Sequence, residues 1–320
     1  MPDLLGVQCI LNGVYQIMPD ILLFPGQGSQ VVGMGRDIFD NSELAKDCYQ
    51  VASDILGFDI AEISFNGPEE SLKLTQYTQP AIFVHSIAVF KILKSKGLTF
   101  SGVAGHSLGE FSAFVAAGVL SFEDAVKLVK VRSSEMANAG EKQPGSMAAI
   151  IGANEDQMKA VCDQDGIVVE ANMNAPGQIV ISGEVNAVSS AVETAKKLGI
   201  RRAIPLNVSG AFHSPLMKPA RESLSDAMEQ LKFNSPTVPV YQNVSAKPET
   251  DIENIKRNIL LQLESPVRWV EIIEKMKLDG HKSFYELGPG KVLHGLNRRI
   301  FRDSTNVSLG KYEDIMHHEF

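Results

Sequence analysis

The sequence predicts an α/β protein with a parallel sheet flanked by helices and a smaller ferredoxin-like subdomain inserted in it. Three observations predict this fold. Short apolar runs alternate with segments of helical spacing along most of the chain, which is typical of a parallel sheet covered by helices. Residues 145–208 instead follow the order β-α-β-β-α-β, which is the ferredoxin-like order. The chain has 320 residues, more than the ~250–300 that one core usually holds, so a second unit is expected.

The first 144 residues alternate strands with helices. We expect strands at 21–24 and 102–105, because both are short apolar runs that end in glycine-rich turns. Pro80 near the start of one helix and Ser121-Phe-Glu-Asp124 at the start of another are helix-initiation signals. Apolar side chains recur at helical spacing in four segments, which predicts helices at 42–56, 78–93, 109–117 and 122–139.

The middle segment has a pattern of its own. Asn154 is placed to cap its first helix, and Asn174-Ala-Pro-Gly177 forms a turn between its two central strands. The pattern predicts strands at 147–151, 167–172, 178–182 and 202–208, with helices at 154–163 and 185–198. We therefore expect a compact subdomain over residues 145–208.

The remainder of the chain returns to the first pattern. It predicts a helix at 215–232, a strand at 238–243, helices at 251–263 and 266–278, a strand at 283–286 and a helix at 290–300. Residues 1–17 are mildly apolar and lack a basic flank, so they fail as a secretory signal. We expect residues 1–17 to be an N-terminal extension without stable structure and residues 310–320 to be a polar tail.

Composition and charge exclude several classes of protein. The chain has 30 Lys and Arg against 38 Asp and Glu, a net charge of −8, which disfavours sequence-independent nucleic-acid binding. Its 3 cysteines are too few and too scattered for a disulfide framework or a zinc site, so we expect a cytoplasmic protein. No segment approaches the ~20 apolar residues that span a bilayer, so we expect no membrane association.

The strongest chemical motif is Gly105-His106-Ser107-Leu108-Gly109, between a predicted strand and a predicted helix. A serine in such a G-x-S-x-G turn exposes its hydroxyl, and the backbone N–H of the next residue can bind an oxyanion. An ordinary glycine turn is the alternative. The strand before it and the helix after it favour a nucleophilic Ser107.

A nucleophilic serine needs a base, and several histidines compete for that role. His85 lies within an apolar helix, where a core side chain is expected, and His106 adjoins the serine and more plausibly supports the turn. His213 follows the last subdomain strand, where the chain re-enters the larger domain. We therefore prefer His213 to His294 as the base.

A second glycine-rich turn, Phe24-Pro25-Gly26-Gln27-Gly28-Ser29-Gln30, follows the first predicted strand. It matches neither the dinucleotide fingerprint, since Val31 stands where glycine or alanine is needed, nor the phosphate loop. Its backbone donors could complete an oxyanion hole, because open α/β sheets place their sites at such strand ends. A plain strand–helix turn remains the alternative.

Taken together, these motifs resemble those of the malonyl-CoA:acyl-carrier-protein transacylases and the related acyltransferase domains of fatty-acid and polyketide synthases. FPGQGSQ, TQPAIF, AGHSLGEFSA, Arg132, NAPGQIVISG, GAFHSPLM, SPVRW and ELGPGKVL carry the resemblance, which covers residues 19–309. It implies a hydrolase-like α/β catalytic domain over residues 18–144 and 209–309, with the ferredoxin-like subdomain at 145–208 as its insertion.

The resemblance also implies roles for individual residues. Ser107 would be the nucleophile, His213 its partner, and Gln27 and Leu108 the backbone oxyanion donors. Gln262 would orient the histidine through its main-chain carbonyl. Arg132 would pair with the malonyl carboxylate, since a guanidinium can make two parallel hydrogen bonds to it. The substrate-binding positions would further include Asn172, Asn174 and Phe212, of which Phe212 matches the malonyl-selecting form of its motif.

The function implied is ping-pong transfer of a malonyl group from malonyl-CoA to the phosphopantetheine thiol of acyl carrier protein, in fatty-acid biosynthesis. No cofactor or metal would be needed, and we expect a monomer. Carrier proteins are acidic, so we expect a basic docking rim, for which the candidates are Arg201, Arg202, Lys218, Lys291, Arg298 and Arg299. The alternatives are a trans-acting malonyl acyltransferase of a polyketide synthase, a serine thioesterase or esterase, and a non-catalytic module that binds carrier protein or CoA.

Overall fold

The computed structural model of the chain describes residues 21–319, so the predicted extension at 1–17 lies outside the described residues. The larger unit is built on a six-stranded sheet in the order β10-β9-β1-β2-β7-β8. All its strands run parallel except β8, which pairs antiparallel with β7. The strands are β1 Ile21–Phe24, β2 Gly102–Gly105, β7 Val240–Tyr241, β8 Pro248–Glu249, β9 Ser283–Leu287 and β10 Thr305–Leu309.

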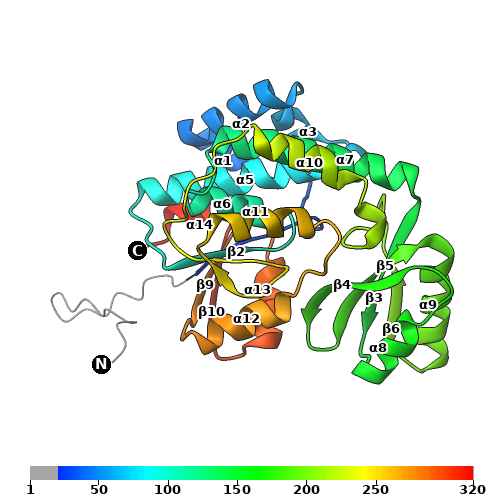
Figure 1. Ribbon diagram of the computed structural model, residues 1–320. Coiled ribbons are helices and arrows are strands. Elements are labelled where there is room, and N and C mark those ends of the chain that lie inside the picture. The colour runs from blue at the N-terminus through cyan, green and yellow to red at the C-terminus, as the bar shows by residue number, and fades with distance from the viewer. Residues whose placement is uncertain (1–20, 320) are drawn as a thin grey trace.

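Helices cover both faces of this sheet (Figure 1). The central strand β1 is fully buried, and its alternating side chains enter two separate cores. Leu22 and Phe24 pack with the layer that contains α5 and α7, whereas Ile21 and Leu23 pack with α12 and α13. The helices are α1 Arg36–Asn41, α2 Glu43–Leu56, α3 Ile60–Asn66, α4 Glu69–Leu72, α5 Thr75–Ser95, α6 Gly109–Ala116, α7 Phe122–Lys142, α10 Ala220–Glu229, α11 Ile252–Leu261, α12 Trp269–Leu278, α13 Val292–Ile300 and α14 Tyr312–Met316.

The smaller unit is an antiparallel sheet in the order β4-β5-β3-β6, which confirms the predicted ferredoxin-like arrangement. Its two helices pack on this sheet around a third core. The elements are β3 Gly145–Ile151, α8 Glu155–Cys162, β4 Val168–Ala175, β5 Gln178–Glu184, α9 Val185–Lys197 and β6 Arg202–Pro205. They lie within the predicted subdomain 145–208, whose boundaries stay a prediction.

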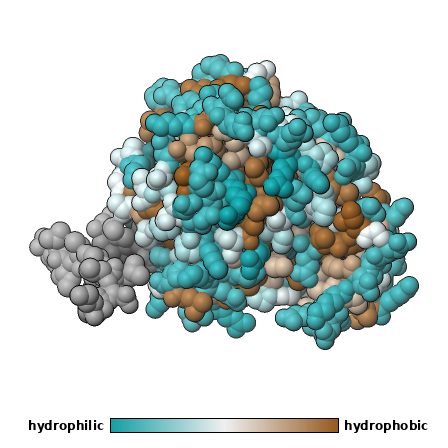
Figure 2. Space-filling view, in the orientation of Figure 1, coloured by the Kyte–Doolittle hydropathy of each residue, from teal (hydrophilic) through white to brown (hydrophobic). Residues whose placement is uncertain are grey.

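The subdomain contacts the larger unit through β4. Asn172 forms a parallel bridge with Val267, and the backbone N–H of Met173 donates to Val267 O at 2.9 Å. In Figure 2 the visible face is mostly hydrophilic, and apolar side chains gather where the subdomain joins the larger unit, at the right. The two units therefore meet along one edge of the small sheet. No helix within residues 21–319 is long and apolar enough to span a bilayer.

Several local predictions differ from the structure. The predicted strand 202–208 ends at Pro205, and the predicted helix 266–278 begins at Trp269. The predicted helix 215–232 is broken into a 3-10 turn, Pro215–Met217, and α10, because Pro219 at the junction has no N–H to continue a helix. Helix α5 starts at Thr75 rather than Thr78, which places Pro80 inside it. The predicted tail 310–320 carries α14, whose Ile315 is fully buried.

Candidate active site

Ser107 lies on a sharp turn between the end of β2 and the start of α6. Its φ of 51° is in the left-handed region, which is sparsely populated by residues other than glycine. A Cβ at Gly105 would overlap the backbone of Gly109, and one at Gly109 would overlap the carbonyl of Phe24. The two glycines are therefore needed for the close approach that holds the serine at the carboxyl end of the sheet.

His213 faces Ser107 from the loop between β6 and the turn at Pro215. Its Nε2 lies 2.8 Å from Ser107 Oγ, and its φ of 59° is also left-handed. Nδ1 lies 2.8 Å from the main-chain carbonyl of Gln262 and 3.1 Å from that of Ser265. Because both carbonyls are acceptors, Nδ1 carries the proton and Nε2 accepts the serine O–H. Two carbonyls thus occupy the position that an acid holds in a Ser-His-Asp triad.

The electrostatics of the site keep His213 neutral. Burial and, to a lesser extent, the positive charge of Arg132 lower the pKa of His213 to about 3. Two carbonyl acceptors act in the opposite direction but do not restore the usual value. An imidazole that remains neutral at physiological pH can accept a proton from the serine.

Arg132 is a buried cation whose direct partners are neutral. It projects from α7 with 1% of its surface exposed. Nη1 donates to Gln79 Oε1 at 2.6 Å, and Nη2 donates to Ser107 Oγ at 3.1 Å and to Gln262 Oε1 at 2.9 Å. Within residues 21–319, Arg132 forms no ion pair, and its Nε has no hydrogen-bond acceptor. Burial lowers the pKa of the Arg132 guanidinium to about 10. Such a charge is costly unless an anion completes the site.

A cavity of about 110 Å³ opens beside Ser107 and His213, at the boundary between the two units. Arg132 and Gln262 are not part of its lining and reach it through Ser107. Its lining includes most of the residues that the sequence singled out: Gln27, Ser107, Leu108, Asn172, Phe212 and His213. Gln79, His106, Met136, Met147, Leu206 and Val208 complete the wall. Six of these twelve residues have apolar side chains and six have polar ones, so the cavity offers both apolar surface and hydrogen-bonding groups to a small ligand.

Two residues that line this cavity have a backbone N–H group without an acceptor within residues 21–319. Among the described residues, no acceptor contacts the N–H of Gln27 or that of Leu108. The N–H of Ser107, in contrast, is occupied by Asn243 Oδ1 at 2.7 Å. Gln27 and Leu108 therefore present two free N–H groups from two different strand ends.

Asn174 lies outside the cavity lining and acts on a neighbour instead. Its Oδ1 accepts from His106 Nε2 at 2.8 Å, and the His106 ring packs against Trp269 with centroids 5.5 Å apart. Burial lowers the pKa of His106. His106 is thus fixed as a neutral part of the cavity wall.

Among residues 21–319 no group of three or more His, Cys, Asp or Glu side chains could hold a metal ion.

Three polar side chains that contact the site residues were missed by the sequence analysis. Gln79 accepts from Arg132, Glu110 accepts from Gln262, and Asn243 accepts from the backbone N–H of Ser107. Gln79 and Glu110 lie inside the quoted motifs TQPAIF and AGHSLGEFSA, so the motifs could have pointed to them. Asn243 follows β7 in no recognisable motif, and it reaches Ser107 across 136 residues of sequence. Only the folded chain brings it to the site.

Comparison with known proteins places this geometry in a family. The family model for the acyl transferase domain matches residues 21–314. A malonyl CoA-acyl carrier protein transacylase of Staphylococcus aureus (strain COL) is 45% identical over 298 residues, which are 92% of this chain and 96% of that protein. The crystal structure of an acyl-carrier-protein-S-malonyltransferase from Bartonella henselae is 40% identical, with a TM-score of 0.90 over 93% of this chain and 98% of that chain.

A second solved structure contains a partner. It is a malonyl-transacylase, PlMCAT, in complex with the type II PKS acyl-carrier protein AntF. That structure is 39% identical, with a TM-score of 0.89 over 93% of this chain and 98% of that chain. Identity at this level over nearly the full length shows common family membership, not the fold alone. The chain therefore belongs to the acyl transferase domain family and, within it, to the malonyl-CoA:acyl-carrier-protein transacylases.

Proposed function

We propose that this protein transfers the malonyl group of malonyl-CoA to the phosphopantetheine thiol of acyl carrier protein, in fatty-acid biosynthesis, through a malonyl-Ser107 intermediate. One observation carries the proposal. Ser107 Oγ lies within hydrogen-bond distance of both a neutral histidine, His213, and a buried arginine without an ion-pair partner, Arg132. A base and a carboxylate receptor thus meet at one hydroxyl.

Arg132 supports the choice of a malonyl over an acetyl group. Gln79 and Gln262 take one hydrogen from Nη1 and one from Nη2. One hydrogen on each terminal nitrogen is then left for the two oxygens of a carboxylate, once the bond to Ser107 Oγ is exchanged. An acetyl group would leave the buried cation without an anion, which disfavours its transfer.

The reaction follows as two acyl transfers. Ser107 Oγ attacks the thioester carbonyl while its proton moves to His213 Nε2, and the N–H groups of Gln27 and Leu108 bind the oxyanion. The C–S bond then breaks, the thiolate takes the proton from His213, and CoA leaves. The carrier thiol attacks malonyl-Ser107 in the same way, His213 takes the thiol proton and returns it to Ser107 Oγ, and the free serine is restored.

The remaining substrate-binding positions support this assignment less directly. Phe212 and Asn172 line the cavity, where they would contact the malonyl chain. Asn174 would act by fixing His106. No resident cofactor or metal is required by these steps, because the phosphopantetheine arrives on both substrates.

Carrier protein would dock around the cavity mouth. All six candidates for a basic rim are exposed, but Arg299 is already engaged with Gln178 Oε1 and the Pro176 carbonyl on the subdomain. We expect the free candidates, Arg201, Arg202, Lys218, Lys291 and Arg298, to contribute more than Arg299 to binding an acidic partner. We further expect the enzyme to act as a monomer in the cytoplasm.

Intact-mass measurement after treatment with malonyl-CoA tests the chemistry. The wild type should gain one malonyl group, Ser107→Ala should gain none, and the exposed-serine control Ser190→Ala should behave as the wild type. When carrier protein is added, the enzyme should lose the malonyl adduct and the carrier protein should gain the same mass. An adduct that persists in Ser107→Ala would refute the nucleophile, and rapid malonate release without carrier would favour a thioesterase or esterase.

The PKS carrier bound to PlMCAT makes a polyketide role the second candidate. Fatty-acid and polyketide synthesis use the same malonyl donor but different carrier proteins, so the preferred carrier protein distinguishes the two roles. Transfer should have a higher kcat/KM with a fatty-acid carrier protein than with a type II PKS carrier protein. The reverse order would assign the enzyme to polyketide synthesis.

A further inference from the structure

Glu110 is a buried carboxyl group that the proposed mechanism does not use. It lies in the first turn of α6, three residues after Ser107, and is fully buried. Oε1 accepts from the backbone N–H of Asn243, and Oε2 accepts from Gln262 Nε2. Burial raises the pKa of Glu110 to about 8, against these two hydrogen bonds and the charge of Arg132. A carboxyl group in such surroundings needs a specific reason to be there.

Its first partner, Asn243, holds the turn that carries Ser107. Asn243 Oδ1 accepts from the Ser107 N–H at 2.7 Å, and Asn243 Nδ2 donates to the Gly105 carbonyl at 2.7 Å. One side chain thus contacts the backbone on both sides of His106. Ser107 has a left-handed φ, a conformation that persists only where the surroundings impose it.

The second partner, Gln262, connects Glu110 to the other half of the site. Gln262 Nε2 also donates to the Ser107 carbonyl at 3.1 Å, while Oε1 accepts from Arg132 at 2.9 Å. Rotating this amide by 180° would set its oxygen against Glu110 Oε2 and its NH₂ group against the guanidinium. Glu110 therefore fixes the orientation that gives Arg132 an acceptor. The main-chain carbonyl of Gln262 accepts from His213.

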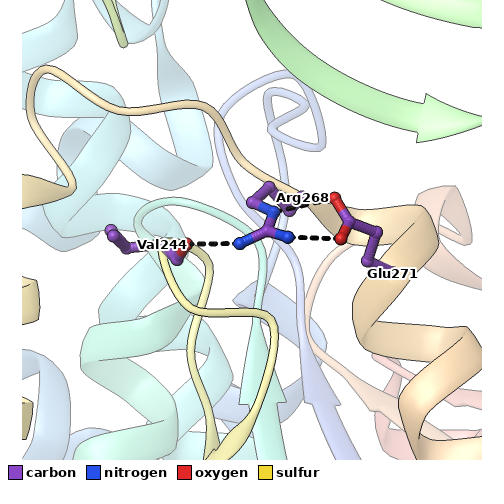
Figure 3. Close-up of polar contacts among 3 residues, drawn as sticks. All are labelled: Val244, Arg268 and Glu271. Atoms are coloured by element: carbon purple, nitrogen blue, oxygen red, sulfur yellow. Dashed lines mark hydrogen bonds and ion pairs between the residues drawn. The ribbon is translucent and has the colours of Figure 1, made fainter.

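The segment after Asn243 is also fixed from the opposite side. Arg268 Nη1 donates to the Val244 carbonyl at 3.1 Å, and the same guanidinium binds both carboxylate oxygens of Glu271 (Figure 3). The backbone N–H of Arg268 donates to the Asn243 carbonyl at 3.3 Å. Asn243 is therefore held between the start of α12 and Glu110, with little freedom to follow a displaced serine.

From these contacts we infer that Glu110 is a positioning residue for the acyl transfer, which it serves by holding Asn243 and Gln262 against the backbone of Ser107. The inference rests on the proposed function, since it concerns the rate at which Ser107 is malonylated. It also explains why the oxyanion donor is the N–H of Leu108 rather than that of Ser107, which Asn243 occupies.

The test is Glu110→Gln, which keeps the shape of the side chain but offers one acceptor oxygen and one NH₂ group to two donors. The rate of malonyl-Ser107 formation should be measured by quenched-flow mass spectrometry at saturating malonyl-CoA. We expect it to fall about ten-fold or more, the effect of leaving one buried hydrogen-bond donor without an acceptor. Glu123→Gln, which removes an exposed carboxylate on α7, is the matched control and should keep the wild-type rate.

The final extent of labelling distinguishes positioning from a merely structural role. A positioning residue lowers the rate while one malonyl group per chain is still reached. A structural residue lowers the fraction of chains that react, with an unchanged rate in those that do. Glu110→Gln with a normal rate, or with only a reduced extent, overturns the inference.

A double-mutant cycle with Asn243→Ala gives a second measurement. If the two residues act as one unit, the double variant should lose no more than the more damaged single variant, whereas multiplicative losses would contradict the inference. The result that refutes this inference differs from the result that refutes the proposed function. A wild type without an adduct overturns both, while equal rates in wild type and Glu110→Gln overturn this inference alone.

Discussion

Replacing Arg132 by alanine should invert the preference of this enzyme between malonyl-CoA and acetyl-CoA. The guanidinium is 1% exposed and has no ion-pair partner among the described residues, so a bound malonyl carboxylate would be its counter-charge. Without Arg132, that carboxylate would enter a buried site lined by the neutral side chains of Gln79 and Gln262. The acetyl group carries no charge and meets no such penalty.

The size of the effect follows from the burial. Removing one partner of a buried charge pair costs about 3–5 kcal/mol. At about 1.36 kcal/mol per factor of ten, this corresponds to a loss of roughly 150-fold to 5,000-fold in kcat/KM for malonyl-CoA. Water that enters the space of the missing side chain favours the lower end of this range. For acetyl-CoA no charge pair is lost. The variant loses the bond from Nη2 to Ser107 Oγ and leaves the amide oxygens of Gln79 and Gln262 without their arginine donor, so the loss should be smaller, about ten-fold.

The assay is acyl transfer to carrier protein, with each acyl-CoA in turn and then with both in competition. The control is Arg302→Ala, which removes an exposed positive charge that is not part of the site, and it should leave both rates unchanged. Equal losses for the two substrates in Arg132→Ala would refute the carboxylate role. They would instead indicate that Arg132 acts only on Ser107 and Gln262.

Three further predictions follow from burial, packing and charge. The pKa of about 3 keeps His213 neutral, so kcat/KM for malonylation should not fall between pH 7.5 and 5.5; an inflection near the usual histidine value of about 6.5 would contradict this. Gly109→Ala places a Cβ against the Phe24 carbonyl, so it should lower the melting temperature and abolish malonylation, and a stable, active variant would show that the turn can adjust. Ile315→Ala should destabilise the fold by about 2 kcal/mol or more in urea unfolding, whereas the half-exposed Met316→Ala should be nearly neutral; equal effects would mean that α14 does not pack as described.

The sequence predicts best those features that are written in neighbouring residues. The turn at Ser107 was predictable because an apolar strand, two glycines and a helix follow one another directly. The ferredoxin-like order was predictable because its strands alternate and its first helix is capped, as the reciprocal bonds between Asn154 and Gln157 show. In both places, local propensity and the global fold favour the same conformation.

Features that depend on distant contacts could not be predicted in this way. Asn243 gains its role only when β7 pairs beside β2, which brings it to Ser107. The break at Pro219, in contrast, is a local feature that the proline itself indicates, and the helical spacing of apolar side chains on both sides of it outweighed that signal. Helix α14 has five residues, too few to establish a periodic pattern, and Ile315 is buried only by packing on other elements.

The left-handed backbone of both Ser107 and His213 has a consequence for folding. Each such residue is unfavourable in isolation by roughly 1 kcal/mol or more, and the two are far apart in sequence, so neither is set by its local segment. Secondary structure and collapse can therefore be complete while the two side chains still fail to meet. During refolding, transferase activity should return after the helical signal. Under mild denaturant it should disappear first, so activity reports on the native packing of this chain more sensitively than its helix content does.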